Sequence, residues 1–142
     1  MRHSNIRILF AVALAASGII VQSVSAQLVN GYMHTGTILT NTQTDTWTFT
    51  ASAGDWIILR AGDTGNSTNF EPGIWLYGPN LALLASSAGG ADWMEVALVV
   101  TNSGTFSVTV GDGNASNAGS GAYRLTLLKA PQVDACDGMR CE

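Results

Sequence analysis

The sequence predicts an all-β protein, an eight-stranded antiparallel β-sandwich. Short runs in which apolar and polar residues alternate, the period of a half-buried strand, recur roughly every 10–13 residues. Each run ends in Gly, Asn, Asp or Ser, which favour turns. No helical periodicity follows the first 26 residues. Short strands at regular spacing, without helices, are typical of a two-sheet sandwich or a barrel.

Residues 1–26 are expected to form a signal peptide. Arg2 and Arg7 precede an apolar run, and small residues up to Ala26 fit a signal-peptidase site, so we expect cleavage before Gln27. The apolar run is about 14 residues, short of the roughly 20 that span a bilayer, so no membrane insertion is expected after cleavage. The protein is therefore expected to be secreted, either extracellular or periplasmic.

The charge balance excludes several classes of partner. The chain has 6 Lys and Arg against 10 Asp and Glu, and loss of Arg2 and Arg7 leaves 4 against 10, a net charge of −6. Nucleic acids are bound by clustered Lys and Arg, so no nucleic-acid partner is expected. About 115 residues remain, enough for one domain with a core.

The N-terminal half of the domain contains three expected strands, after a lead-in segment at residues 27–35. Trp47 and Phe49 alternate with threonines, and the turn Ala53-Gly54-Asp55 leads straight into the next apolar run. A polar loop over residues 62–69 follows. The three strands cover residues 36–40, 45–51 and 56–61.

The C-terminal half contains five more expected strands. The turn Gly78-Pro79-Asn80 predicts a hairpin. Phe106 and Val108 alternate with Ser and Thr, and a long Gly- and Asn-rich loop over residues 111–121 precedes the last strand. The five strands cover residues 74–77, 81–86, 92–100, 105–110 and 122–128. The domain is thus expected to span residues 36–129.

The apolar phase of these strands predicts the core, because alternate side chains of a strand share one face. The expected core residues are Ile38, Trp47, Phe49, Ile57, Leu59, Ile74, Leu76, Val96, Leu98, Phe106, Val108, Val110, Tyr123, Leu125 and Leu127.

The tail at residues 130–142 carries the chain's two cysteines, Cys136 and Cys141. Export favours a disulfide between them. It would close a short loop and stabilise the chain by only about 2 kcal/mol, so we expect it to order the tail and not the sandwich. Pairing between molecules is the alternative.

Several segments together resemble the bacterial pre-peptidase C-terminal domain family. They are DTWTFT (45–50), AGD (53–55), FEPGIWLYGP (70–79), GTFSVTV (104–110) and GAYRLTL (121–127). The resemblance covers about residues 36–128. It implies a jelly-roll sandwich that serves as a non-catalytic accessory or adhesion module of an exported bacterial protein. Members of this family include domains that bind collagen, polysaccharide or calcium, and many that have no known ligand. Leu81 and Trp56 depart from the family pattern, which usually has Gly and a small polar residue there.

The tryptophans are the strongest functional feature of the sequence. Trp47 is in phase with the expected core, whereas Trp56, Trp75 and Trp93 are out of phase with the inward residues of their strands. Tyr77 is out of phase in the same way. Outward aromatic rings stack on sugars or anchor a protein partner, so Trp56, Trp75 and Tyr77 are the candidate ligand-binding residues. The alternative is that loops or the tail cover them.

Metal binding is a weaker hypothesis. The segment beginning at Asp112 starts like a calcium loop, but Asn117 stands where the loop needs Gly and Tyr123 where it needs Glu. An irregular calcium site at Asp63 or Asp112 remains an alternative, and no cofactor is expected to be required. Zinc is disfavoured by the shortage of His and Cys ligands.

Catalysis is poorly supported. The mature chain has one histidine, His34, expected as an exposed bystander, and it has no G-x-S-x-G motif. Asp92 and Glu95 lie three apart on a strand and therefore point to opposite faces. The expected function is a secreted, non-catalytic binding or adhesion module that contacts an extracellular polysaccharide or a matrix or envelope protein. A self-assembling envelope protein is the alternative, and a small hydrolase comes third.

Overall fold

The computed structural model describes residues 25–40, 42–65, 69–90, 93–114 and 119–131. Most of the signal segment and both tail cysteines lie outside these residues, so signal cleavage and the Cys136–Cys141 disulfide stay predictions. The described part of the chain contains no helix that could span a membrane.

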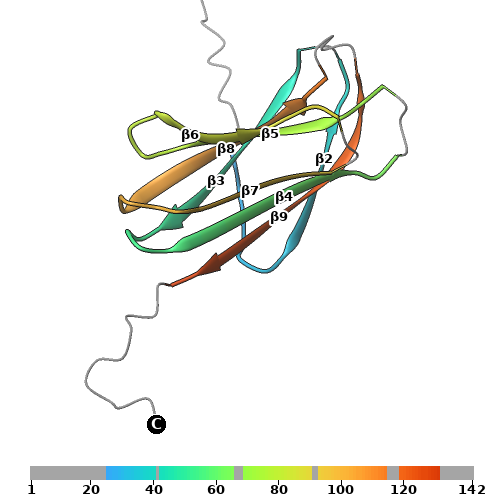
Figure 1. Ribbon diagram of the computed structural model, residues 1–142. Helices are drawn as coiled ribbons and strands as arrows, with labels where there is room; N and C mark the ends of the chain where they lie inside the picture. Colours follow the sequence, from blue (N-terminus) through green and yellow to red (C-terminus); the bar gives the residue numbers. More distant parts are fainter. Residues whose placement is uncertain (1–24, 41, 66–68, 91–92, 115–118, 132–142) are drawn as a thin grey trace, which may run out of the picture.

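Nine strands form in the described residues, and they build two sheets that pack face to face (Figure 1). One sheet has five strands in the order β1-β3-β8-β5-β6, and the other has four in the order β2-β9-β4-β7. The strands are β1 (Ala26–Gln27), β2 (Met33–Ile38), β3 (Thr44–Ala51), β4 (Trp56–Asp63), β5 (Pro72–Tyr77), β6 (Leu83–Ser87), β7 (Trp93–Val99), β8 (Gly104–Asp112) and β9 (Gly121–Ala130).

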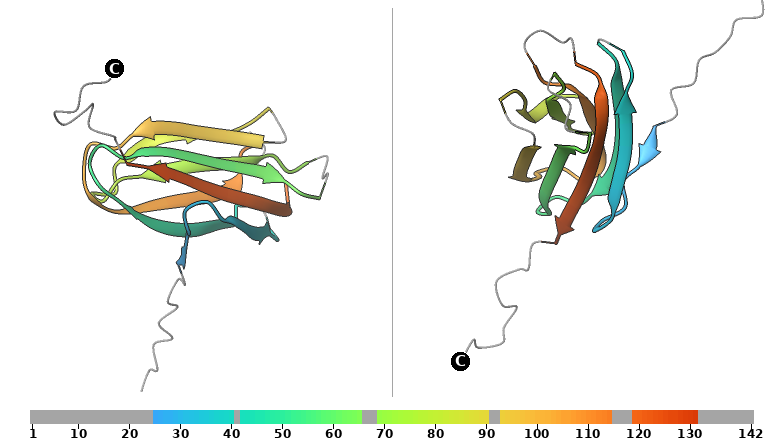
Figure 2. Two further views of the ribbon diagram at one scale, coloured as in Figure 1. Left: turned by 90° about the horizontal axis from the view of Figure 1, so that it is seen from below. Right: turned by 90° about the vertical axis from the view of Figure 1, so that its right-hand side faces the viewer.

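The predicted jelly-roll sandwich is confirmed. Among the described strands only β5 and β6 form a hairpin within one sheet, and every other connection crosses to the opposite sheet (Figure 2). This crossing leaves β2–β9 as two interleaved four-stranded layers, the arrangement of a jelly roll. All pairings are antiparallel except that of β1 with β3. The ninth strand is the two-residue β1, which was not among the expected strands.

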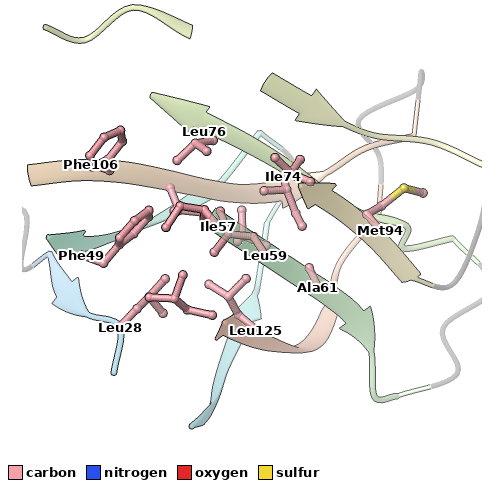
Figure 3. Packing of buried hydrophobic residues seen from close by; sticks show 14 of the residues in the cluster. Leu28, Phe49, Ile57, Leu59, Ala61, Ile74, Leu76, Met94, Phe106 and Leu125 are labelled. Atoms are coloured by element: carbon pink, nitrogen blue, oxygen red, sulfur yellow. The ribbon is translucent and has the colours of Figure 1, made fainter. Parts of the chain in front are cut away.

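The core fills the space between the sheets (Figure 3). Phe49 on β3 lies opposite Phe106 on β8, and their rings stack with centroids 5.3 Å apart. Thirteen of the expected core residues are buried, whereas Trp47 and Leu98 are only partly buried. The core also contains residues that the sequence analysis did not assign to it: Leu28, Ala51, Ala61, Phe70, Met94 and Val100.

Residues 27–35 were expected to form a lead-in segment outside the sandwich, but in the structure they contribute to its strands and core. Leu28 is buried, with 4% of its surface exposed, and its backbone amide donates to the Thr48 carbonyl at 2.8 Å. β2 begins at Met33, three residues before the expected strand, and ends at Ile38. His34 is therefore a half-buried strand residue and not an exposed bystander. At the other end, β9 extends two residues past the expected strand, to Ala130.

A polar bridge formed by Asp45, Trp47 and Tyr123 joins the two sheets. The Tyr123 hydroxyl donates to Asp45 Oδ2 at 2.7 Å and accepts from Trp47 Nε1 at 2.9 Å. Burial, and then the hydrogen bond to Asp45, raise the pKa of Tyr123 well above its usual range, although the bond from Trp47 acts in the opposite direction. Trp47 is half-buried. The His34 ring lies beside its indole, tilted by 58°, with ring centroids 5.3 Å apart.

Candidate functional site

An apolar strip lies on the outer face of the four-stranded sheet. It consists of Trp56 and Ile58 on β4, Ala97 and Val99 on β7, and Leu128 on β9. Register makes these residues neighbours, because Trp56 pairs with Val99, and Ile58 lies between Ala97 and Leu128. Trp56 is 48% exposed. Contiguous exposed apolar side chains of this kind mark interaction surfaces more often than scattered ones do.

A charged row follows the apolar strip along the same face. Arg60 on β4 lies between Glu95 on β7 and Thr126 on β9, and its guanidinium forms an ion pair with Glu95. Arg60 is exposed and Glu95 is partly exposed, so we attribute no large stabilisation to the pair. The ion pair instead holds the Arg60 side chain in the direction of Glu95 on the neighbouring strand β7.

A groove of about 380 Å³ lies beyond this row, and we call it the Arg124–Trp93 groove. Gly62 on β4 pairs with Trp93 on one side and Arg124 on the other, so a residue without a side chain separates an indole from a guanidinium. Trp93 is 60% exposed. The groove is lined by Arg60, Ala61, Gly62, Trp93, Arg124 and Thr126.

A second groove, of about 300 Å³, lies on the outer face of the five-stranded sheet. It is lined by Thr42, Gln43, Thr44, Trp75, Tyr77, Thr109 and Asp112. Trp75 is only half-buried, and its ring lies over the glycine pair Gly73 and Gly111, where an added Cβ would approach the ring to 2.5 Å and 3.7 Å. Trp75 therefore covers bare backbone, as aromatic residues opposite sheet glycines do.

Two polar side chains of this second groove, Gln43 and Asp112, already form hydrogen bonds within the protein. The Gln43 side chain accepts from the Leu39 amide at 2.9 Å. Asp112 Oδ2 accepts from the Gly119 amide at 2.8 Å, and Asp112 Oδ1 accepts from the amides of Glu71 and Asn114, each at 3.2 Å. A ligand in this groove would have to compete with those bonds.

The candidate calcium residues do not meet in one cluster. Asp112 is buried and accepts hydrogen bonds from three backbone amides. Asp63 Oδ1 accepts a hydrogen bond from the Gly65 amide at 2.7 Å, within a local turn. Within the described ranges, no group of three or more His, Cys, Asp or Glu side chains is placed to hold a metal ion. The calcium site at Asp63 or Asp112 stays a prediction.

The β5–β6 hairpin carries an unusual turn. Leu81 adopts φ of +62° while 76% of its surface is exposed. That conformation favours glycine and costs roughly 1–2 kcal/mol for other residues. The Leu81 amide donates to the Gly78 carbonyl at 2.9 Å, so the turn keeps the backbone that a glycine would adopt. Leu83 and Leu84, which follow it, are also exposed.

Solved structures of similar fold include a collagenase domain and two lysozyme inhibitors. The pre-peptidase C-terminal domain of a collagenase from Bacillus anthracis matches with a TM-score of 0.60 at 14% identity, over 75% of this chain and 96% of the domain. PliG of Aeromonas hydrophila, a periplasmic inhibitor of g-type lysozyme, matches at 0.58, with 17% identity over 75% and 96%. PliG of Salmonella Typhimurium matches at 0.53, with 14% identity over 75% and 98%.

The chain has a pre-peptidase C-terminal fold. The resemblance inferred from the sequence motifs is confirmed at the level of fold. No protein-family model matches the sequence, and no curated protein matches it at a significant level. Identities of 14–17% leave the ligand of this chain to be argued from its own surface.

The predicted ligand-binding residues of this pre-peptidase-like sandwich fall on two opposite faces. Trp56 lies on the four-stranded sheet, and Trp75 and Tyr77 lie together on the five-stranded sheet. The alternation of the sequence correctly predicted that all three side chains face outward. It does not indicate which sheet each strand joins. It also placed Trp93 out of phase, without linking it to Arg124, because β7 and β9 are far apart in sequence and meet only through β4.

Proposed function

We propose that the protein is an exported, non-catalytic binding module that holds an extracellular polysaccharide on the outer face of its four-stranded sheet. The observation that carries this proposal is the placement of Trp56 and Trp93 on that one face, both about half exposed or more. Six residues along β4 separate their positions, about 20 Å at the rise of a strand. Two exposed aromatic rings on one face of a sheet suit an extended chain of sugar rings.

The opposite face is the weaker candidate for two physical reasons. Trp75 already covers the glycines of its own sheet, and the neighbouring Gln43 and Asp112 side chains form hydrogen bonds within the protein. On the four-stranded sheet, by contrast, the described residues give Arg124 no ion pair. The four-stranded face therefore offers both an uncovered ring and an uncommitted charged donor.

A binding screen tests the proposal. The exported chain would be applied to arrays of polysaccharides and of matrix and envelope proteins, once with calcium and once with chelator. We expect retention on polysaccharide that weakens about tenfold in Trp56→Ala, since burial of one aromatic side chain contributes about 1.5–3 kcal/mol. Retention unchanged in Trp56→Ala would contradict the proposed face, and Trp75→Ala serves as the variant of the opposite face.

A protein partner is the second candidate, and a separate observation favours it. The hairpin tip presents Leu81, Leu83 and Leu84 to solvent, and aliphatic side chains anchor proteins more readily than sugars. Two of the similar structures are named as inhibitors of a lysozyme, which is itself a protein target. If this candidate holds, Leu81→Ser should abolish retention on the protein array and leave polysaccharide retention unchanged.

Self-association through the apolar strip is the remaining alternative. It would bury Trp56, Val99 and Leu128 between copies of the chain. Solution mass measured across a range of protein concentrations separates it from ligand binding. Large species that grow with concentration, and that disappear in Trp56→Ala, would favour self-assembly over the polysaccharide proposal.

A further inference from the structure

We propose that the Arg124–Trp93 groove is a subsite for a uronic acid residue of an acidic polysaccharide. This inference rests on the proposed polysaccharide function and specifies its ligand. In it, the Trp93 indole stacks on the sugar ring while the Arg124 guanidinium binds the ring carboxylate.

The register of three strands builds the subsite. Arg124 on β9, Gly62 on β4 and Trp93 on β7 form one row across the sheet. Two strand spacings separate the outer members of the row, about 10 Å. Gly62 is buried and places no side chain between the guanidinium and the indole, and the groove that these residues line measures about 380 Å³. A single sugar ring with its carboxylate is of a size to occupy that gap.

Charge placement favours an anionic ligand over a neutral one. The described residues contain three Lys and Arg side chains, and two of them, Arg60 and Arg124, line this groove. Glu95 neutralises Arg60, while Arg124 has no acidic partner among the described residues. The third cation, Lys129, donates from Nζ to the Thr50 carbonyl at 2.8 Å and lies outside the groove. In a chain of net charge −4, the groove is thus a local cationic site.

The chemistry of the pair selects a carboxylated sugar. A guanidinium offers two parallel N–H donors that match the two oxygens of a carboxylate. An indole face favours the apolar face of a ring over a flexible acidic side chain. Thr126 and the Arg60–Glu95 pair flank the row and present hydroxyl, donor and acceptor groups to sugar hydroxyls. Neither a neutral sugar nor an acidic peptide would use both members of the row.

Affinity measurements on three soluble polymers test the inference. The probes are polygalacturonate, its fully methyl-esterified form, and polyglutamate. We expect polygalacturonate to bind about tenfold more tightly than the ester, because the ester cannot accept the bidentate charged bonds. Polyglutamate should bind weakly, since it carries carboxylates without a ring to stack.

Four variants assign the effect to the row, after thermal melting shows that each is folded. Arg124→Gln should erase the preference for polygalacturonate over its ester, and Arg124→Lys should restore it only in part. Trp93→Ala should weaken binding of both polymers about tenfold. Lys129→Gln removes the same charge outside the groove and should change nothing.

Four results would overturn the inference. Polyglutamate bound as tightly as polygalacturonate, or Lys129→Gln as damaging as Arg124→Gln, would show that charge attraction alone is responsible. If polygalacturonate and its ester bind equally and Trp56→Ala loses binding of both, the uronate subsite is refuted. The proposed function would be unaffected by that result. Absence of binding to any polysaccharide would overturn both.

Discussion

Tyr123 is a buried residue that forms two hydrogen bonds from one sheet to the other. Its hydroxyl uses both its donor and an acceptor site, on Asp45 and Trp47 of the opposite sheet. Gly36 makes room for it, because a Cβ there would lie 2.3 Å from the Tyr123 hydroxyl. The phenol is therefore held as a neutral donor in a site shaped for it.

Replacing Tyr123 with Phe should destabilise the fold by about 1–3 kcal/mol, since Trp47 and Asp45 each lose a partner while packing is kept. The change should also alter the pH dependence. The folded pKa of Tyr123 is raised, so above about pH 10 the unfolded chain releases this proton first and the parent loses stability as pH rises. Chemical denaturation between pH 7 and 11 should show a shallower decline for Tyr123→Phe. Parallel declines would contradict the assignment of the bridge.

Leu81 has a backbone conformation that is unfavourable for a leucine, with φ of +62°. Leu81→Gly removes the strain of a leucine at φ of +62°, against the extra freedom that glycine has in the unfolded chain. We expect a net gain of up to about 1 kcal/mol, a rise of a few degrees in melting temperature. A fall in melting temperature would instead mean that Leu81 contacts hold the turn.

At the scale of elements, the short β1 strand closes one side of the sandwich. It contributes only two strand residues, but Leu28, which follows it, enters the core (Figure 3). Cleavage before Gln27 would remove Ala26, one of the two residues of β1, and would leave Gln27 and Leu28 in the mature chain. The N-terminus of the exported protein would then be part of the fold and not a free tail.

Leu28→Ala should cost about 2–5 kcal/mol, as truncation of a buried leucine does. Val29→Ala is the matched control, because Val29 is half exposed and adjacent in sequence, and it should change stability little. Urea unfolding of the two variants gives the comparison. Similar losses in both, or in neither, would contradict the packing of Leu28 in the core.

The two outer faces should respond differently to loss of a tryptophan. Trp75→Ala uncovers the Gly73–Gly111 pair and should destabilise the domain by about 1–2 kcal/mol. Trp56→Ala removes an exposed ring and should leave the melting temperature within the usual range for surface changes. Equal losses would mean that Trp56 is covered in solution, and the apolar strip would then not be available to a ligand.

At the scale of the whole molecule, alternation was a good guide to which side chains face inward and a poor guide to which strands are neighbours. It identified Ile57, Leu59, Ile74 and Leu76 as core because a strand's period is local. It missed Leu28 because a two-residue strand has no period to detect. It did not join Arg124 to Trp93 because crossover connections bring β9 beside β4, and no local pattern records that pairing.

The central claim, that the outer face of the four-stranded sheet is the binding surface, is tested most directly by one affinity measurement. The affinity of the double variant Trp56→Ala/Trp93→Ala would be compared with that of the parent chain for a polysaccharide that the parent binds. The two residues lie about 20 Å apart, so the losses of binding free energy should add. We therefore expect the affinity to fall roughly 100-fold, with the melting temperature nearly unchanged. Parental affinity in the folded double variant would contradict the claim.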